Sequence, residues 1–463
     1  MSGDTWRGAI PMYAELRAND PVHWVEEGHY WVVSRFVDVF NAARDTARFS
    51  SAQGLTFERG EREQLGIDIA PMVMMDPPEH TGFRRLVASG FTPRKVAELE
   101  PAIREFVTER LDRLAEHGGG DIVAELFKPL PSFVVAHYLG VPAEDRARFD
   151  DWTEAIVSAN AAGSALDAEH AVAGLVTYFS DLIDRRRSEL VLARSAVGGP
   201  APSASATSPR GSEPGAAGDA RTGLGAPGLG GTWADDSGLD GSGLGAAGPG
   251  AAGLGAAGLG AAGPGAAGPD DTVSKLVLAE ARGEAVDVLA ILGFAFTMVT
   301  GGNDTVTGLL GGATELLAEH PEQRRRLVEQ PDLIGSAVEE LLRLTSPVQG
   351  LARTTTEAVE IGGVSIPKDA KVLLLYASAN RDHDEFGPDA DELDVERAIT
   401  RQMSFSYGAH HCLGAAAARL QGRVALEELL ARWPGYEVVP DSAEFAPGPF
   451  VKRHARLDIR VGQ

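Results

Sequence analysis

Cys412 is the only cysteine among the 463 residues of the chain, and this single thiol limits what the chain can build. A chain of this length with one cysteine has no internal disulfide and cannot form a metal site from several thiolates. Three roles for Cys412 stay open at this point: an inert residue of the core, a catalytic nucleophile, or the single thiolate ligand of a cofactor.

The residues that flank Cys412 favour a thiolate. A run rich in helix formers follows it to about Trp433, whereas Gly408 and two histidines precede it, so Cys412 lies at or just before a helix N-terminus. The free amide groups and positive dipole there lower the pKa of a thiol. A zinc site of His410, His411 and Cys412 is disfavoured, because adjacent side chains point apart and a fourth ligand is missing. A cysteine hydrolase remains open, since any of the 11 histidines could serve as its base.

The run from Phe405 to Gly414 has the pattern Phe-x-x-Gly-x-His-x-Cys-x-Gly, which resembles the haem-binding loop of the cytochrome P450 family. The resemblance implies that haem b (iron protoporphyrin IX) is the cofactor and that Cys412 is the axial ligand of its iron, where a thiolate favours O–O cleavage. Phe405, Gly408, His410 and Gly414 would complete the cofactor-binding loop, with the glycines allowing a close approach to the porphyrin.

A second motif lies within a helical pattern that runs from about Asp287 to Glu319. Gly301 and Gly302 in its middle cost about 1 kcal/mol each relative to alanine, which suggests close packing or a kink. On the residues alone, a glycine-rich helix contact with a solvated acid is equally open. The resemblance implies a helix across the distal haem face, in which Asp304 and Thr305 are catalytic and relay protons to bound oxygen. Thr305 would bond to the carbonyl of Gly301.

Four cations match the family's contacts to the haem propionates. His80 and Arg84 lie one turn apart at the start of a predicted helix, although a solvated basic face explains their local sequence equally well. With Arg353 and His410 they would offset two buried carboxylates.

A further motif has a structural role in the family. Glu340 and Arg343 share one helix face before Pro347, and Arg397 follows in a segment that resembles the family's meander. The spacing alone is common, and Glu339 competes for Arg343. The resemblance implies a network of Glu340, Arg343 and Arg397.

Composition changes abruptly from about residue 198 to residue 268, where 23 of the 55 glycines lie. Residues 244–268 are five copies of a unit that reads Leu or Pro and then Gly-Ala-Ala-Gly, so the period of three of collagen is excluded. Few large side chains offset the entropy of ordering, and we expect a disordered insertion over 198–268. Because the haem motifs lie on both sides of it, residues 1–197 and 269–463 are expected to form one domain.

The expected fold is mostly α with a small β region, the single-domain P450 fold, with haem between a long distal helix and the helix after the Cys loop. Helical patterns cover 101–116, 143–161 and 169–190, and alternating runs at 30–33 and 371–375 predict strands.

Charge and hydropathy exclude several partners. The net charge of −24 argues against nucleic acid or an anionic membrane. The longest strongly apolar stretch, 289–299, is too short to span a bilayer, and the N-terminal residues lack a signal-peptide pattern. With one unpaired cysteine, these features predict a cytoplasmic protein without a membrane anchor.

The resemblance implies a haem-thiolate monooxygenase that inserts one atom of O₂ into an apolar small molecule by hydroxylation or epoxidation. A sterol, fatty acid, terpenoid or polyketide would qualify, and the expected pocket walls are 50–75, 152–166, the surroundings of Val299, 348–351 and 450–451. Electrons would come from NAD(P)H through a ferredoxin and its reductase, since we find no flavin or iron–sulfur domain in the sequence. Two alternatives are a haem-binding sensor or carrier and a peroxide-using relative; the Asp304–Thr305 pair speaks against both.

Overall fold

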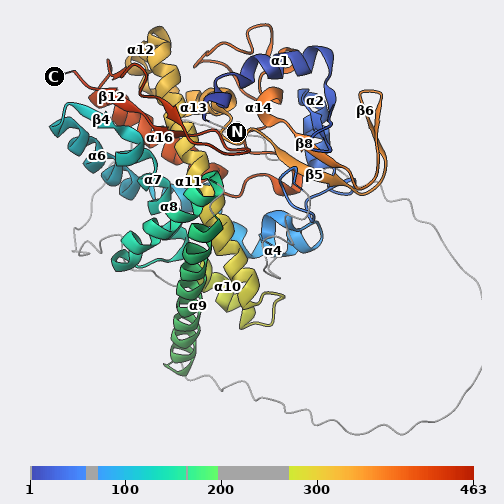
Figure 1. Ribbon diagram of the computed structural model, residues 1–463. Helices are drawn as coiled ribbons and strands as arrows, with labels where there is room; N and C mark the ends of the chain where they lie inside the picture. Colours follow the sequence, from blue (N-terminus) through green and yellow to red (C-terminus); the bar gives the residue numbers. More distant parts are fainter. Residues whose placement is uncertain (1–2, 59–70, 163–164, 197–270, 463) are drawn as a thin grey trace, which may run out of the picture. The chain divides into compact units, whose positions relative to one another are not determined.

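The structure is a computed structural model that describes residues 3–58, 71–162, 165–196 and 271–462 (Figure 1). The chain divides into one unit of residues 1–193 with 263–463 and a second of 194–262. Every candidate site residue belongs to the first unit. The predicted disorder of 198–268 concerns residues that all lie outside the described ranges, so it stays a prediction.

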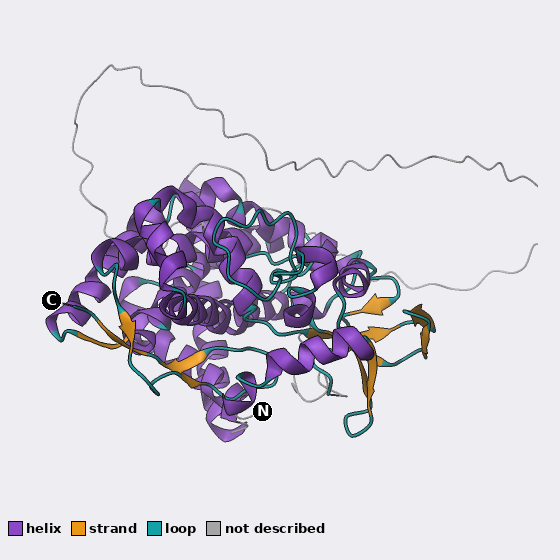
Figure 2. Ribbon diagram, turned by 90° about the horizontal axis from the view of Figure 1, so that it is seen from above, coloured by secondary structure: helices purple, strands orange, loops and turns teal. Residues whose placement is uncertain are grey.

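Helices form most of the described chain, and Figure 2 shows the strands in separate groups at the margin of the helical body. The α-helices are α1 (Ala9–Asn19), α2 (Phe36–Arg44), α4 (Glu79–Ala88), α5 (Pro93–Ala97), α6 (Glu100–Glu116), α7 (Pro129–Leu139), α8 (Arg146–Ala162), α9 (Ala165–Ala196), α10 (Thr272–Glu280), α11 (Val288–Glu319), α12 (Pro321–Glu329), α13 (Ile334–Thr345), α14 (Tyr376–Ala379), α15 (His383–Phe386) and α16 (Ala415–Arg432). Short helical turns are η1 (Gly3–Trp6), η2 (Met72–Met74), η3 (Ser89–Phe91), η4 (Val123–Phe127), η5 (Ala143–Asp145), η6 (Pro331–Leu333) and η7 (Gly408–His410).

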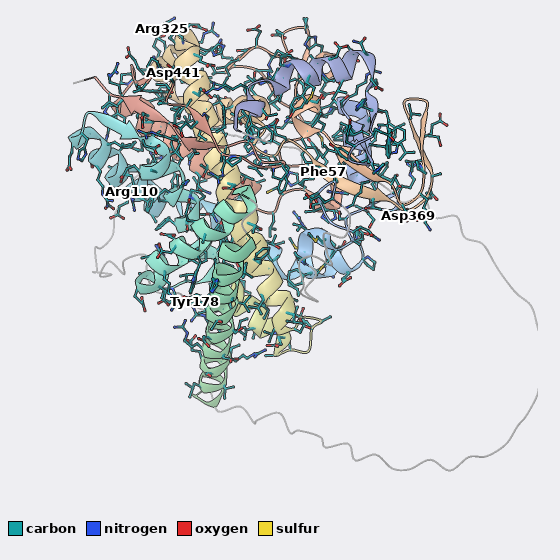
Figure 3. The ribbon with its side chains drawn as sticks, viewed as in Figure 1. Phe57, Arg110, Tyr178, Arg325, Asp369 and Asp441 are labelled. Carbon is teal, nitrogen blue, oxygen red and sulfur yellow. The ribbon has the colours of Figure 1, made fainter. Side chains whose placement is uncertain are left out.

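The strands are β1 (Val22–Val25), β2 (Tyr30–Val33), β3 (Phe49–Ser50), β4 (Gly119–Asp121), β5 (Leu351–Thr355), β6 (Val359–Ile361), β7 (Val364–Ile366), β8 (Lys371–Leu374), β9 (Glu437–Val438), β10 (Glu444–Phe445), β11 (His454–Arg456) and β12 (Asp458–Arg460). The main sheet has the order β1-β2-β8-β5-β3, in which β8 is parallel to β2 and antiparallel to β5. Arg353 pairs with Val372 between these inner strands. In Figure 3, Phe57 lies on the side of this sheet, where its ring stacks on Tyr30, and Tyr178 lies on the helical side.

Helix α11 is buried on most of its circumference and packs against α7, α13 and α16. Asp287 caps it by accepting a bond from the Ala290 amide at 2.8 Å. The helix is continuous through its glycines. An added Cβ at Gly302 would lie 2.7 Å from Val135 Cγ2, so close packing is the reason for this glycine.

The predicted elements agree with the structure in type, and differ by a few residues at their ends. The helix expected at 101–116 begins at Glu100, and the one expected at 143–161 divides into η5 and α8. Helix α9 extends beyond 169–190 at both ends. In the described residues, no helix is long and apolar enough to cross a membrane.

The network predicted around Glu340 is present, and in it Glu340 and Arg343 are fully buried while the side chain of Arg397 is 12% exposed. Its carboxylate accepts two bonds from Arg343, at 2.6 and 2.7 Å, and one from Arg397 at 3.2 Å. Glu339 does not compete for Arg343, because it accepts instead from Arg419 at 2.5 Å. Arg343 also donates to the carbonyl of Asn380, which joins α13 to the segment that leads to the Cys loop.

Candidate active site

The loop that carries Cys412 is closed by its own backbone. The Cys412 amide donates to the Phe405 carbonyl at 2.9 Å, and Gly414 is the N-cap of α16, just after the thiol. Gly408 has φ +73°, and an added Cβ there would lie 3.0 Å from the Cα of Arg44. A glycine is therefore required at 408 by both the turn and its neighbour.

The side chain of Cys412 is accessible to solvent, yet its surroundings desolvate it. These facts agree if the thiol faces an internal space rather than the outer surface. Burial raises the pKa of Cys412, and the Gly414 amide together with Arg84 and Arg419 offsets this only in part. The Gly414 amide lowers the pKa as expected of a helix N-terminus, but the expectation that the thiolate is favoured overall is wrong, because it neglected burial. Coordination to a metal, which displaces the thiol proton, would supply the missing driving force.

Four side chains that were predicted to be cations come together from α4, β5 and η7, the last of which belongs to the Cys loop. His80 and Arg84 lie on α4, Arg353 on β5 and His410 on η7. The rings of His80 and His410 are 4.2 Å apart between centroids. Burial lowers the pKa of His410 to about 3, and the charges of Arg353, His80 and Arg84 add to this effect.

The two arginines of this group lack the anions that an interior site requires. Within the described ranges, no carboxylate lies at ion-pair distance from Arg84 or Arg353, although Arg353 is 2% exposed. The Nδ1 atom of His80 is buried and has no hydrogen-bond partner. Buried cations and orphaned donors are costly unless a ligand satisfies them. A haem group, with two propionates to meet the cations and an iron atom to meet Cys412, fits this set.

The second predicted group lies on α11. The Thr305 hydroxyl donates to the Gly301 carbonyl at 2.9 Å, as predicted. Gly301 is exposed although it lies in the middle of α11, and an added Cβ there would meet no atom within 4 Å. Unlike Gly302, Gly301 therefore borders open space. Such a space beside a hydroxyl is what a small oxygen ligand would need.

Asp304 forms a contact that was not predicted. Its Oδ1 atom lies 2.6 Å from Nε of Arg453, and the two side chains are 20% and 6% exposed. Burial raises the pKa of Asp304, while Arg453 acts in the opposite direction. The only local sign of this contact was the basic run Lys452-Arg453-His454, which does not indicate which acid it would meet.

Two of the predicted pocket walls lie side by side. Val348 and Val451 form a β-bridge, and the Gln349 amide donates to the Phe450 carbonyl at 2.8 Å. Two other walls, at 50–75 and 152–166, lie partly outside the described residues.

Comparisons with known proteins agree with this geometry. A model of the family Cytochrome P450 matches residues 266–442. Cytochrome P450 130 of Mycobacterium tuberculosis is 48% identical over 469 aligned residues, which cover 99% of this chain and 96% of that protein. Vitamin D(3) 25-hydroxylase of Pseudonocardia autotrophica is 31% identical, with coverage of 100% and 96%. The solved structure of CYP109E1 from Bacillus megaterium in complex with corticosterone matches with a TM-score of 0.74, at 26% identity and 99% coverage of both chains.

Proposed function

The chain belongs to the cytochrome P450 family and is a haem-iron monooxygenase, and on this premise we propose that Cys412 binds the iron and that the substrate is a steroid-sized apolar molecule. One observation carries the proposal. An accessible thiol lies in desolvating surroundings near the buried Arg353 and the half-buried Arg84, and neither arginine has a carboxylate partner in the described chain. A packed, inert cysteine would have neither feature.

The proposed roles follow from the positions of the residues. Cys412 would bind the iron of haem b, while Phe405, Gly408 and Gly414 hold the loop in shape. The propionates would be met by the cation group of His80, Arg84, Arg353 and His410. When bound, the haem iron would supply the site at which dioxygen is activated.

Asp304 and Thr305 would handle the protons. The Thr305 hydroxyl donates to the Gly301 carbonyl of its own helix, and Gly301 borders open space. A rotation of the hydroxyl would let it release this bond and donate into that space instead. Because adjacent side chains of a helix point apart, the proton that Asp304 returns to Thr305 would pass through intervening water. A peroxide-using enzyme has no need of this pair, and the pair therefore favours O₂ as oxidant.

The proposal for the substrate rests on apolar walls and on two relatives. Met72 and Met74 are buried in η2, which packs against α11. Val299, two residues before Gly301 in α11, is also buried. Methionine side chains adapt to ligands of irregular shape. One relative is named for the hydroxylation of vitamin D(3), and one matched structure holds corticosterone. We therefore propose an apolar molecule of the steroid or secosteroid class.

Electrons are proposed to arrive from NAD(P)H through a ferredoxin and its reductase. One cysteine cannot hold an iron–sulfur cluster, which takes four protein ligands, mostly thiolates. The electron carrier is thus expected to be a separate protein.

Isotope labelling tests the proposed reaction. Purified enzyme would receive NADPH, a surrogate ferredoxin with its reductase, and ¹⁸O₂, with corticosterone, vitamin D(3), dodecanoic acid and a macrolide as separate probes. We expect one ¹⁸O atom in a hydroxylated product of a steroid or secosteroid probe. If only dodecanoic acid or the macrolide is oxidised, the substrate class is wrong. If no probe acquires ¹⁸O while NADPH is consumed, the proposed substrate chemistry is contradicted.

A further inference from the structure

The segment Lys452-Arg453-His454 lies along one face of α11. Arg453 pairs with Asp304 at 2.6 Å, and Nε2 of His454 lies 3.0 Å from Oε2 of Glu315. Asp304 and Glu315 are separated by three helical turns and face the same side of α11. The basic segment thus meets acids at two points of a single helix face.

Two glycines between these acids make room for the segment. An added Cβ at Gly308 would lie 2.5 Å from the Lys452 carbonyl oxygen, and one at Gly311 would lie 2.6 Å from Nδ1 of His454. Backbone atoms and a buried ring leave little freedom to move. Any larger residue would push the segment away from α11 and separate Arg453 from Asp304.

The main chain of Arg453 is also held from its other side. Its carbonyl accepts from the Ala446 amide at 2.9 Å, and the preceding residue, Lys452, donates from its amide to Pro347 at 2.8 Å. The backbone position from which the Arg453 guanidinium reaches Asp304 is therefore fixed. A fixed cation on one carboxylate oxygen orients the whole carboxyl group.

Arg453 has a distinct place among the charges that act on Asp304. Lys128 and Glu154 also act on it, but they form their own pair at 2.8 Å and their side chains are 31% and 50% exposed. The segment is already tied to α11 by His454 and Glu315, so its attachment does not depend on Arg453 alone. What Arg453 adds is a defined position for the acid next to Thr305.

We infer that Arg453 is a positioning residue, which fixes the Asp304 carboxyl so that its proton passes to the water that leads to Thr305 rather than to bulk solvent. This inference rests on the proposed proton relay of Asp304 and Thr305. It extends the relay by a residue that is remote in sequence and that acts through Asp304.

The test compares haem-loaded variants that receive NADPH, a surrogate ferredoxin and its reductase but no substrate, so that the electrons reduce O₂ to peroxide or to water. The variants are Arg453→Gln, Arg453→Lys, Asp304→Asn, the double variant Arg453→Gln with Asp304→Asn, and the control Arg456→Gln. Arg456 lies in β11, three residues after Arg453, is exposed and pairs with Asp458 at 2.8 Å. The readouts are the rate of NADPH consumption, its ratio in H₂O and D₂O, and the peroxide formed per NADPH.

We expect Asp304→Asn to slow the reaction at least about tenfold and to change the solvent isotope effect, as for the loss of a general acid. Arg453→Gln should give a similar change, Arg453→Lys a smaller one, and the double variant should be no slower than Asp304→Asn. The control should match the parent. If the two single effects multiply in the double variant, Arg453 does not act through Asp304 and the inference is wrong.

Infrared spectroscopy gives a readout that does not depend on activity. The band of a protonated carboxyl that is lost in Asp304→Asn should appear at a higher pH in Arg453→Gln than in the parent, since removal of the cation disfavours the carboxylate. If Arg453→Gln does not bind haem, the same measurements on Arg453→Lys test the inference. Kinetics and an infrared band in Arg453→Lys equal to those of the parent would then overturn it. If Asp304→Asn slows turnover while the Arg453 variants do not, only this inference fails. If Asp304→Asn has no effect, the proposed relay itself fails.

Discussion

The Cys412 loop and the Asp304 site on α11 are built in opposite ways. The loop spans ten consecutive residues and is closed by the bond from the Cys412 amide to the Phe405 carbonyl. Asp304 instead owes its surroundings to Arg453, which belongs to a segment near the end of the chain. A motif therefore describes the first site almost completely, whereas the chemistry of the second depends on a contact that only folding creates.

The strongest test of this contrast breaks the network of Glu340, which joins α13 to the segment that leads to the Cys412 loop. Glu340 is fully buried and binds Arg343 and Arg397, so Glu340→Gln should destabilise the fold by about 3 kcal/mol. Because the loop closes on itself, the haem that remains bound should still show thiolate ligation. Thermal unfolding and the spectrum of the carbon monoxide complex measure the two effects. Glu385→Gln, which breaks the more exposed pair with Arg401, is the control and should cost less than about 1 kcal/mol. A loss of thiolate ligation in Glu340→Gln would mean that the loop is not locally determined.

Thr305→Ala separates function from stability on α11. The lost bond to Gly301 is a bond within the helix, so the fold should lose less than about 1 kcal/mol and haem binding should persist. Product formed per NADPH should fall several-fold, with a matching release of peroxide. Thr297→Ala is the matched control, because Thr297 makes the same bond to Gly293 at 2.8 Å two turns earlier. Equal coupling in Thr305→Ala and in the parent would argue against a proton relay.

The pair of Glu315 and His454 should give α11 a pH-dependent stability. Burial raises the pKa of Glu315, but the hydrogen bond and charge of His454, together with the charges of Arg7 and Lys452, outweigh burial and leave the pKa below its usual value of 4.5. The pair therefore stabilises the fold above about pH 4.5, and this contribution, of about 1 kcal/mol, is lost as the pH falls through the lowered pKa. Chemical unfolding from pH 6 to pH 3 should show a smaller loss in Glu315→Gln than in the parent. Glu437→Gln, a change at an exposed acid, should follow the parent; identical slopes for all three proteins would refute the assignment.

Deletion of residues 201–264 should have the smallest effect. The helices on either side are joined directly, since Arg187 binds Glu280 at 2.5 Å and Arg186 lies 3.3 Å from Asp271. For a disordered segment, which the composition of 198–268 predicts, shortening changes the closure entropy by only about 0.6 kcal/mol per halving. The haem content and thermal midpoint of the deletion variant should equal those of the full chain. An insoluble or haem-free variant would show that this segment contributes to the fold.

The sequence predicted what depends on neighbours in the chain. The bond of Thr305 to Gly301 and the bonds of Glu340 to Arg343 follow from helical spacing, and both are present. The raised pKa of Cys412 was not predicted, because burial by distant residues outweighs the local effect of a helix N-terminus. The pairing of Arg453 with Asp304 was not predicted either, because the basic run around Arg453 does not indicate which acid it contacts. The approach of that run to Gly308 likewise depends on tertiary packing, which a single sequence does not display.

The central claim is that Cys412 binds haem iron, and the carbon monoxide spectrum of the reduced protein tests it most directly. The parent protein should show the band typical of thiolate ligation, and Cys412→His should move it to the position typical of histidine-ligated haem. His411→Ala, a change one residue away, should keep the parental band. If the parent lacks the thiolate band, or if Cys412→His retains it, Cys412 is not the ligand and the assignment of the site is wrong.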